Sequence, residues 1–141
     1  MRMPEISRTA QEMVSGMTPT VRSGEFVFVT VADPALAASL SSEAISFFKE
    51  DEGMSLIIPV ETARGASLSV DQPMRCITLN VYSSLDGVGL TSAVSTALGD
   101  NAIPCNMVAA FHHDHLFVPT KMHDRALQIL TVLQDQAARD A

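Results

Sequence analysis

The sequence predicts an α+β protein in which helices cover one face of an antiparallel sheet. Segments rich in β-branched and aromatic residues alternate with amphipathic helical stretches, and polar turns join neighbouring strands into hairpins. One passage, a strand that ends at proline and opens directly into a helix, occurs twice in the chain. Hairpins combined with crossover helices predict a sheet whose helices lie on one side.

The N-terminal half is predicted to contain three strands. The acidic run Glu50-Asp51-Glu52 supplies a polar turn between the second and third, and we interpret it as a solvated turn. Asp33-Pro34 ends the first strand and begins one or two helical turns. The predicted segments are a short helix over residues 7–16 with Ser7 as its N-cap, and strands over residues 25–31, 44–48 and 54–58.

The C-terminal half carries the clearer pattern. Leu90, Val94, Ala97 and Leu98 lie on one face of a predicted helix, which Gly99 ends. A tight turn at residues 112–114 joins two further strands. The predicted segments are strands over residues 75–82, 102–111 and 115–118, and a last helix capped by Thr120 whose apolar stripe includes Leu130.

Two short matches indicate an internal repeat. LIIPVE at residues 56–61 and LFVPTK at residues 116–121 each end a hairpin strand with proline and open a helix. We therefore predict two tandem units, residues 1–72 and 73–141, each with the ferredoxin-like order βαββα(β). The N-terminal unit is degenerate and lacks a full first helix. The last strand of the C-terminal unit is missing, and residues 18–22, the first unit or a second subunit can fill its place.

The C-terminal passage resembles the ACT domain, a small regulatory module of amino-acid metabolism. DGVGL at residues 86–90 is similar to the family's loop between first strand and helix, with Val88 where the common pattern has proline. DNAIPCN at residues 100–106 is similar to its turn into the second strand. The chain resembles the domains of aspartokinase regulatory regions, and also small bacterial tandem-ACT proteins and the related cytosolic arginine sensors. This resemblance implies allosteric binding of an amino acid and no catalysis.

The loop before the central helix is the predicted ligand site. Helix N-termini expose unpaired backbone N–H groups that can hold a carboxylate, here near Val88 and Gly89. Asp86 can take the ligand ammonium by a charge-assisted hydrogen bond. The alternative is a tight crossover without ligand, since glycine suits such turns by itself. The predicted ligand-binding residues are Ser84, Leu85, Asp86, Gly87, Val88, Gly89, Leu90, Ala102 and Ile103.

A second cluster, His112-His113-Asp114-His115, has the side chains of a zinc or nickel site. Neighbouring residues of a strand point to opposite faces, so these groups cannot all converge on one ion. We predict no metal and no cofactor. We also find no nucleophile–base pair and no phosphate-binding motif, and therefore predict no enzymatic activity.

Composition limits the partners. The 141 residues are 47% hydrophobic and 18% charged, with net charge −7 and a pI of about 4.8. An acidic chain without a basic patch predicts neither nucleic acid nor membrane as partner. The apolar fraction and the missing strand predict a homodimer or a higher oligomer. Two cysteines, Cys76 and Cys105, fall in apolar strands and are predicted to be buried free thiols of a cytoplasmic protein.

Two function classes follow. The first is a regulatory protein that binds an amino acid or a similar small ligand. The alternative is an interaction module that only dimerises, with no small ligand. The residues determine neither the ligand nor the regulated partner.

Overall fold

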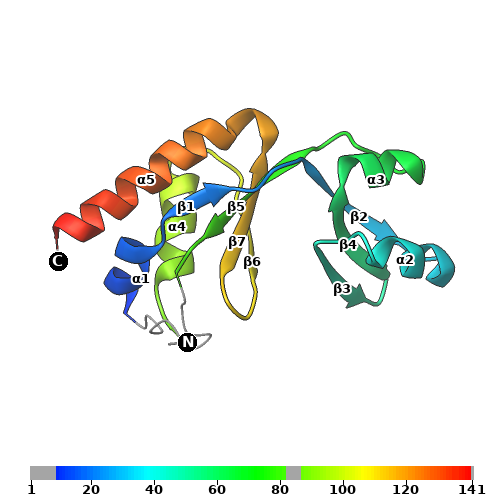
Figure 1. Cartoon of the computed structure of the whole chain (residues 1–141), viewed down its shortest axis with the longest axis horizontal. Coiled ribbons are helices and arrows are strands. Elements are labelled where there is room, and N and C mark those ends of the chain that lie inside the picture. The colour runs from blue at the N-terminus through cyan, green and yellow to red at the C-terminus, as the bar shows by residue number, and fades with distance from the viewer. Residues whose placement is uncertain (1–8, 82–86, 141) are drawn as a thin grey trace. The chain divides into compact units, whose positions relative to one another are not determined.

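A computed structural model describes residues 9–81 and 87–140. None of the helices in these two ranges combines the length and the apolar character needed to cross a membrane. The elements are α1 Ala10–Gly16, β1 Pro19–Val21, β2 Phe26–Val31, α2 Pro34–Ser41, β3 Ser46–Glu50, β4 Gly53–Pro59, α3 Val60–Gly65, β5 Met74–Leu79, α4 Leu90–Gly99, β6 Asn106–Ala109, β7 Asp114–Pro119, the 3₁₀ turn η1 Thr120–Met122 and α5 His123–Arg139 (Figure 1).

The chain forms two compact units and passes from one to the other twice. The inserted unit comprises Ser23–Met74, and the outer unit comprises the chain up to Arg22 together with Arg75–Ala141. The sequence predicts a single boundary after residue 72, with the first residues in the N-terminal unit, whereas α1 and β1 pack with the C-terminal half.

In the inserted unit, three antiparallel strands lie in the order β3-β4-β2. Helices α2 and α3 pack on one face, where Val27 and Val31 of β2 and Leu56 and Ile58 of β4 are buried. Alternating side chains of a strand face opposite sides, so these four residues share the helix side. Only the first residue of β5 joins this sheet, since Met74 pairs with Phe26. The predicted ferredoxin-like plan is confirmed here, and α2, with 8 residues, is about the two turns expected after Asp33-Pro34.

In the outer unit, the strands lie in the order β1-β5-β7-β6. β1 pairs antiparallel with β5, with Thr20 opposite Thr78. The side chain of Asn80 adds to this pairing, because its Nδ2 donates to the Thr18 carbonyl at 2.8 Å and to Thr20 Oγ1 at 2.8 Å. Of the three candidates for the missing strand, the N-terminal segment therefore closes this sheet.

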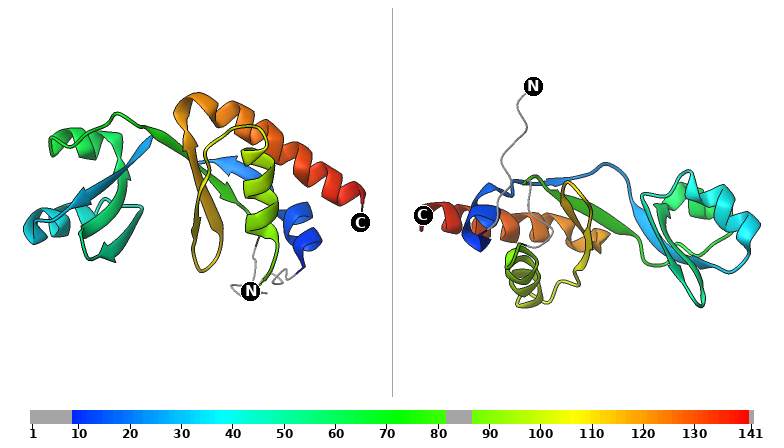
Figure 2. Two further views of the ribbon diagram at one scale, coloured as in Figure 1. Left: turned by 180° about the vertical axis from the view of Figure 1, so that it is seen from behind. Right: turned by 90° about the horizontal axis from the view of Figure 1, so that it is seen from below.

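Three helices cover one face of the outer sheet. α1 contacts both α4 and α5, and the further views in Figure 2 show the three side by side. Met13 and Met17 of this N-terminal segment are 1% and 0% exposed and lie in the same core as Val94 and Leu130. Gln134 of α5 fixes the segment further, since its Nε2 donates to the Ser15 carbonyl at 2.9 Å. The first helix is thus an integral part of the C-terminal core.

Two helix starts differ from the sequence prediction. Thr9 is the N-cap of α1, and its hydroxyl accepts from the Glu12 N–H at 3.1 Å. Ser7, the predicted cap, lies outside the described residues. Thr120 begins η1, and α5 starts three residues later at His123, without a side-chain cap.

We expect Met13→Ala to weaken the outer unit alone. Removing a fully buried methionine side chain lowers the free energy of unfolding by about 2–5 kcal/mol. Hydrogen exchange should therefore show faster exchange of the β5 and β7 amides, with the β4 amides unchanged. Leu40→Ala, at a buried position of α2, is the matched control and should give the reverse pattern. Faster exchange of β4 in Met13→Ala would contradict the assignment of α1 to the outer unit.

Candidate ligand-binding site

The start of α4 is the described part of the predicted ligand loop. Gly89 is its N-cap, with φ 111°, and no side chain of the described residues caps the helix. A helix start without a side-chain cap leaves N–H groups for solvent or a ligand. Val88 is 81% exposed, whereas Leu90 is 3% exposed and belongs to the core. The predicted residues Ser84, Leu85 and Asp86 lie outside the described residues, and Gly87 is half-buried.

Gly89 also has a packing role. A Cβ built on it would lie 2.5 Å from the Cβ of Ala10, and its positive φ strains any other residue. α1 therefore packs closely against the start of α4. Gly89, near which the sequence predicts a bound carboxylate, thus also has a close neighbour within the protein. A larger residue in place of Gly89 therefore disturbs the packing of α1 against α4 as well as the loop before α4.

Ala102 and Ile103 lie at the other end of α4. The ten residues of the helix span about 15 Å between the two ends. The N–H of Ala102 donates to the Gly99 carbonyl and that of Ile103 to the Leu98 carbonyl, each at 3.0 Å, so both close the helix C-terminus. Ile103 is also 3% exposed. Both residues therefore lie at the end of α4 opposite Gly89, where the helix starts. Gly99, a predicted helix end, was the signal that Ala102 follows the C-terminus.

The equivalent helix start in the inserted unit, that of α2, is capped by a side chain. Asp33 caps α2, and its Oδ1 accepts from the Ala35 N–H at 3.1 Å. Pro34, the first helical residue, has no N–H to offer. Within the part of the chain that the structure describes, a side chain caps the helix start after the first of these two related loops but not the start of α4.

The histidine cluster at the β6–β7 hairpin is dispersed. His115 Nδ1 lies 2.9 Å from Thr78 Oγ1, and the ring centroids of His113 and His115 are 6.4 Å apart. Among residues 9–81 and 87–140, no group of three or more His, Cys, Asp or Glu side chains can hold a metal ion. Thr78 is 9% exposed, so His115 serves as the hydrogen-bonding partner of a buried hydroxyl.

Burial is the main cause of the pKa shifts of the titratable groups on this sheet face. Burial lowers the pKa of His115, and the nearby charges of Arg22 and His113 lower it further, while Asp114 raises it. Burial also raises the pKa of the Cys76 thiol, against weaker opposing effects of Arg22 and a hydrogen bond with Thr78. Both cysteines are free, Cys76 buried and Cys105 half-buried, and burial raises the pKa of the Cys105 thiol as well. A raised pKa keeps both thiols protonated and unreactive at neutral pH.

Sequence reasoning missed this polar sheet face. Cys76 and Thr78 of β5, and Asn80 directly after it, alternate with the apolar residues Ile77 and Leu79. That alternation is the period-2 signal of a strand with one polar side, and it was available in the sequence.

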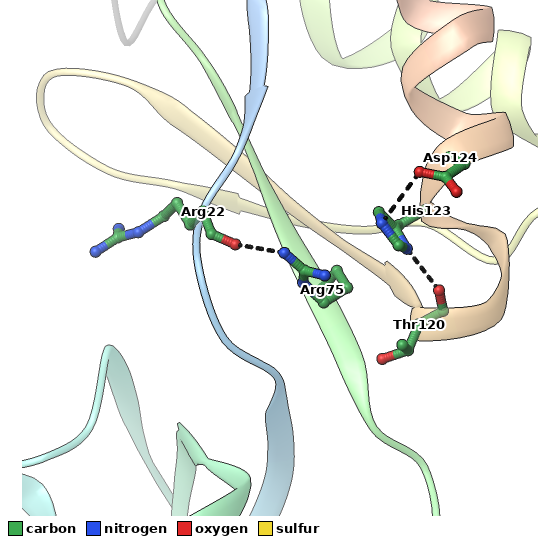
Figure 3. Close-up of polar contacts among 5 residues, drawn as sticks. All are labelled: Arg22, Arg75, Thr120, His123 and Asp124. Atoms are coloured by element: carbon green, nitrogen blue, oxygen red, sulfur yellow. Dashed lines mark hydrogen bonds and ion pairs between the residues drawn. The ribbon is translucent and has the colours of Figure 1, made fainter.

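A second group of polar contacts lies where β1 ends and α5 begins (Figure 3). Arg75 Nη2 donates to the Arg22 carbonyl at 3.1 Å. His123 Nδ1 lies 2.7 Å from the Thr120 carbonyl and its Nε2 lies 3.2 Å from Asp124 Oδ1. The two contacts of His123, which is the first residue of α5, fix the turn between β7 and α5.

Comparison with known proteins agrees with this fold. ACT domain models match residues 8–75 and 72–132. A Vibrio cholerae protein of unknown function, described as a possible transport protein, has 36% sequence identity over 86% of this chain and 92% of its own, with a TM-score of 0.75. No curated protein matches the sequence. The chain belongs to the ACT domain family, as a tandem of two ACT domains, which are typically regulatory ligand-binding domains.

More distant structures share the fold alone. An Agrobacterium tumefaciens protein has 18% identity and a TM-score of 0.61 over 82% of this chain and 87% of its own. The ligand-free regulatory subunit of aspartate kinase from Thermus thermophilus has 10% identity and a TM-score of 0.52 over 84% of this chain and 97% of its own.

His115 should make stability pH-dependent. Its pKa in the folded protein lies below 6.5, so the unfolded chain binds the proton first as pH falls. The free energy of unfolding should therefore be highest above about pH 6.5 and decrease as pH falls below it. Urea unfolding at pH 7.5 and 5.5 measures this loss, which His115→Gln should reduce.

His112→Gln is the control, because His112 is exposed at the hairpin tip. Comparing variants removes the contribution of carboxylates that titrate in the same range. An equal loss of stability in wild type and His115→Gln would contradict the role assigned to His115.

Proposed function

We propose that this chain is a non-catalytic regulatory protein that binds an amino acid, or a similar small molecule with a carboxylate and an ammonium group, at the loop before α4. One observation supports this choice of site most directly: α4 starts at Gly89 without a side-chain cap, whereas Asp33 caps the related helix α2. The proposed site comprises Ser84, Leu85, Asp86, Gly87, Val88, Gly89 and Leu90.

The carboxylate and the ammonium group of the proposed ligand are bound by different groups of the protein. The ligand carboxylate lies on the backbone N–H groups near Val88 and Gly89, where the helix dipole also favours negative charge. The carboxylate of Asp86 accepts from the ligand ammonium. Val88 is exposed and offers an apolar contact to a ligand side chain. This arrangement binds and releases a ligand without changing it, in keeping with the regulatory class of the family.

The alternative function is a ligand-free interaction module. The sequence predicted this module partly from an unpaired sheet edge in the C-terminal unit. In the structure β1 pairs with that edge, so this reason no longer supports dimerisation. Apolar exposure elsewhere in the outer unit, such as Val132 of α5 at 54%, still favours self-association.

We expect at least one of the twenty common amino acids to bind and to raise the unfolding temperature, since a ligand selective for the native state stabilises it. Asp86→Asn should weaken that binding by roughly 1.5–3 kcal/mol, the value of a hydrogen bond to a charged group. A thermal-shift screen followed by titration calorimetry measures both effects.

Asp100→Asn is the matched control, because Asp100 is an exposed aspartate at the opposite end of α4. It should leave affinity unchanged. Absence of binding to all twenty amino acids would favour the interaction module, and wild-type affinity in Asp86→Asn would move the site elsewhere.

We also expect a homodimer. Light scattering across micromolar concentrations should give about twice the 15.1 kDa mass of the chain, the commonest closed assembly. A mass of one chain throughout that range would contradict it.

A further inference from the structure

Charge is distributed unequally between the two units. The inserted unit, Ser23–Met74, contains eight Asp and Glu residues and only two basic residues, Lys49 and Arg64, and so carries a net charge of −6 out of the chain's −7. The outer unit is therefore nearly neutral overall. A partner that contacts the inserted unit gains from positive charge, whereas a second acidic copy is repelled.

The edge strand of the inserted unit carries two adjacent aromatic residues next to its charged residues Lys49 and Glu50. β3 is the last strand in the order β3-β4-β2, and among the described residues it pairs only with β4. Phe47 and Phe48, in the middle of β3, are 55% and 72% exposed. Edge strands are commonly shielded by charges, bulges or proline, because their free backbone groups pair readily with another strand. Here two adjacent aromatic residues occupy that position.

A groove adjoins this edge on the helix side of the sheet. It encloses about 470 Å³ between α2 and the β3–β4 hairpin. Small side chains on α2, Ala37, Ala38 and Ser41, form one wall, and Phe47 and Lys49 form the other. Phe48 faces the opposite side of the sheet, because side chains alternate along a strand. A strand added beside β3 can therefore place alternate side chains in the groove and over Phe48.

Acidic residues flank the same edge. The turn after β3 contains Asp51 and Glu52, both exposed, and Glu50 is the last residue of the strand. Glu43 is exposed just before the strand begins. The edge thus presents an apolar centre with carboxylates at both ends, and Lys49 is its single basic residue.

We propose that the β3 edge docks an extended segment of a different protein, with apolar residues at its centre and Lys or Arg at its ends. The segment adds to the sheet as a strand antiparallel or parallel to β3, and its backbone supplies most of the hydrogen bonds. Its apolar side chains fill the groove beside α2, and its basic residues pair with Glu43, Asp51 and Glu52. The inference rests on the proposed regulatory function, because such a module must contact the protein that it regulates.

The test uses two fluorescent peptides and the full-length chain. One has alternating valine and threonine flanked by lysines at both ends, and the other has glutamates in place of the lysines. Fluorescence anisotropy should show binding of the lysine peptide only, with affinity that falls as salt is raised. The double change Phe47→Ser and Phe48→Ser should weaken binding roughly tenfold or more, as for a central apolar anchor. Asp51→Lys with Glu52→Lys should weaken it as well.

Phe111→Ser is the matched control, because Phe111 is a 76% exposed aromatic residue at the β6–β7 hairpin. It should leave peptide affinity unchanged. No binding of the lysine peptide, equal binding of the glutamate peptide, or equal affinity in the Phe47 and Phe48 variant would each overturn the proposal. A wild-type dimer that the same variant dissociates would also overturn it and would identify a second copy as the occupant.

Failure of this proposal is separable from failure of the proposed function. The β3 variants lie in the inserted unit and should leave amino-acid binding at the α4 loop unchanged in calorimetry. Amino-acid binding without peptide binding would overturn only the docking edge. Peptide binding without amino-acid binding would support the edge and overturn the ligand site.

Discussion

The pairing of β1 with β5 is the contact on which the outer unit depends. It supplies the fourth strand of the sheet and carries α1 into place over α4 and α5. Without it, the edge of β5 and the apolar residues around Ile77 and Leu79 would lose their cover. The contact also reaches the proposed ligand loop, because α1 packs against Gly89 at the start of α4. Sheet closure and loop geometry are therefore linked through one short N-terminal segment.

Most of the fold could be predicted from the sequence, for identifiable reasons. β2, β4, β5 and β7 were found because they combine β-branched residues with proline or polar turns, and α4 because its apolar residues follow the helical period. The position of α1 and β1 could not be predicted in the same way. β1 has only three residues, and its partner β5 comes after the whole inserted unit in the sequence. Local patterns contain no information about such a distant pairing, so it stayed one of three alternatives.

The candidate site was predictable in part. The loop before α4 was recognised from its glycines and its place at a helix start, and Gly89 does occupy that start. Ala102 and Ile103 were assigned to the same pocket on resemblance, although α4 separates them from the loop. Helix length alone argues against the assignment within one unit. The tight contact between Gly89 and Ala10 was not predictable, since it depends on the long-range placement of α1.

The insertion has a consequence for how the chain folds. Phe26 and Met74 pair within the inserted unit, so that unit, once folded, holds its entering and leaving segments next to each other. When β1 then pairs with β5, the chain between them is already held together at its two ends by the folded inserted unit. The entropic cost of bringing β1 and β5 together is therefore lower than the cost of closing an unfolded loop of the same length. During synthesis β1 emerges first and β5 much later, with the complete inserted unit between them. The topology therefore favours an order in which the middle of the chain forms first and brings its two flanks together.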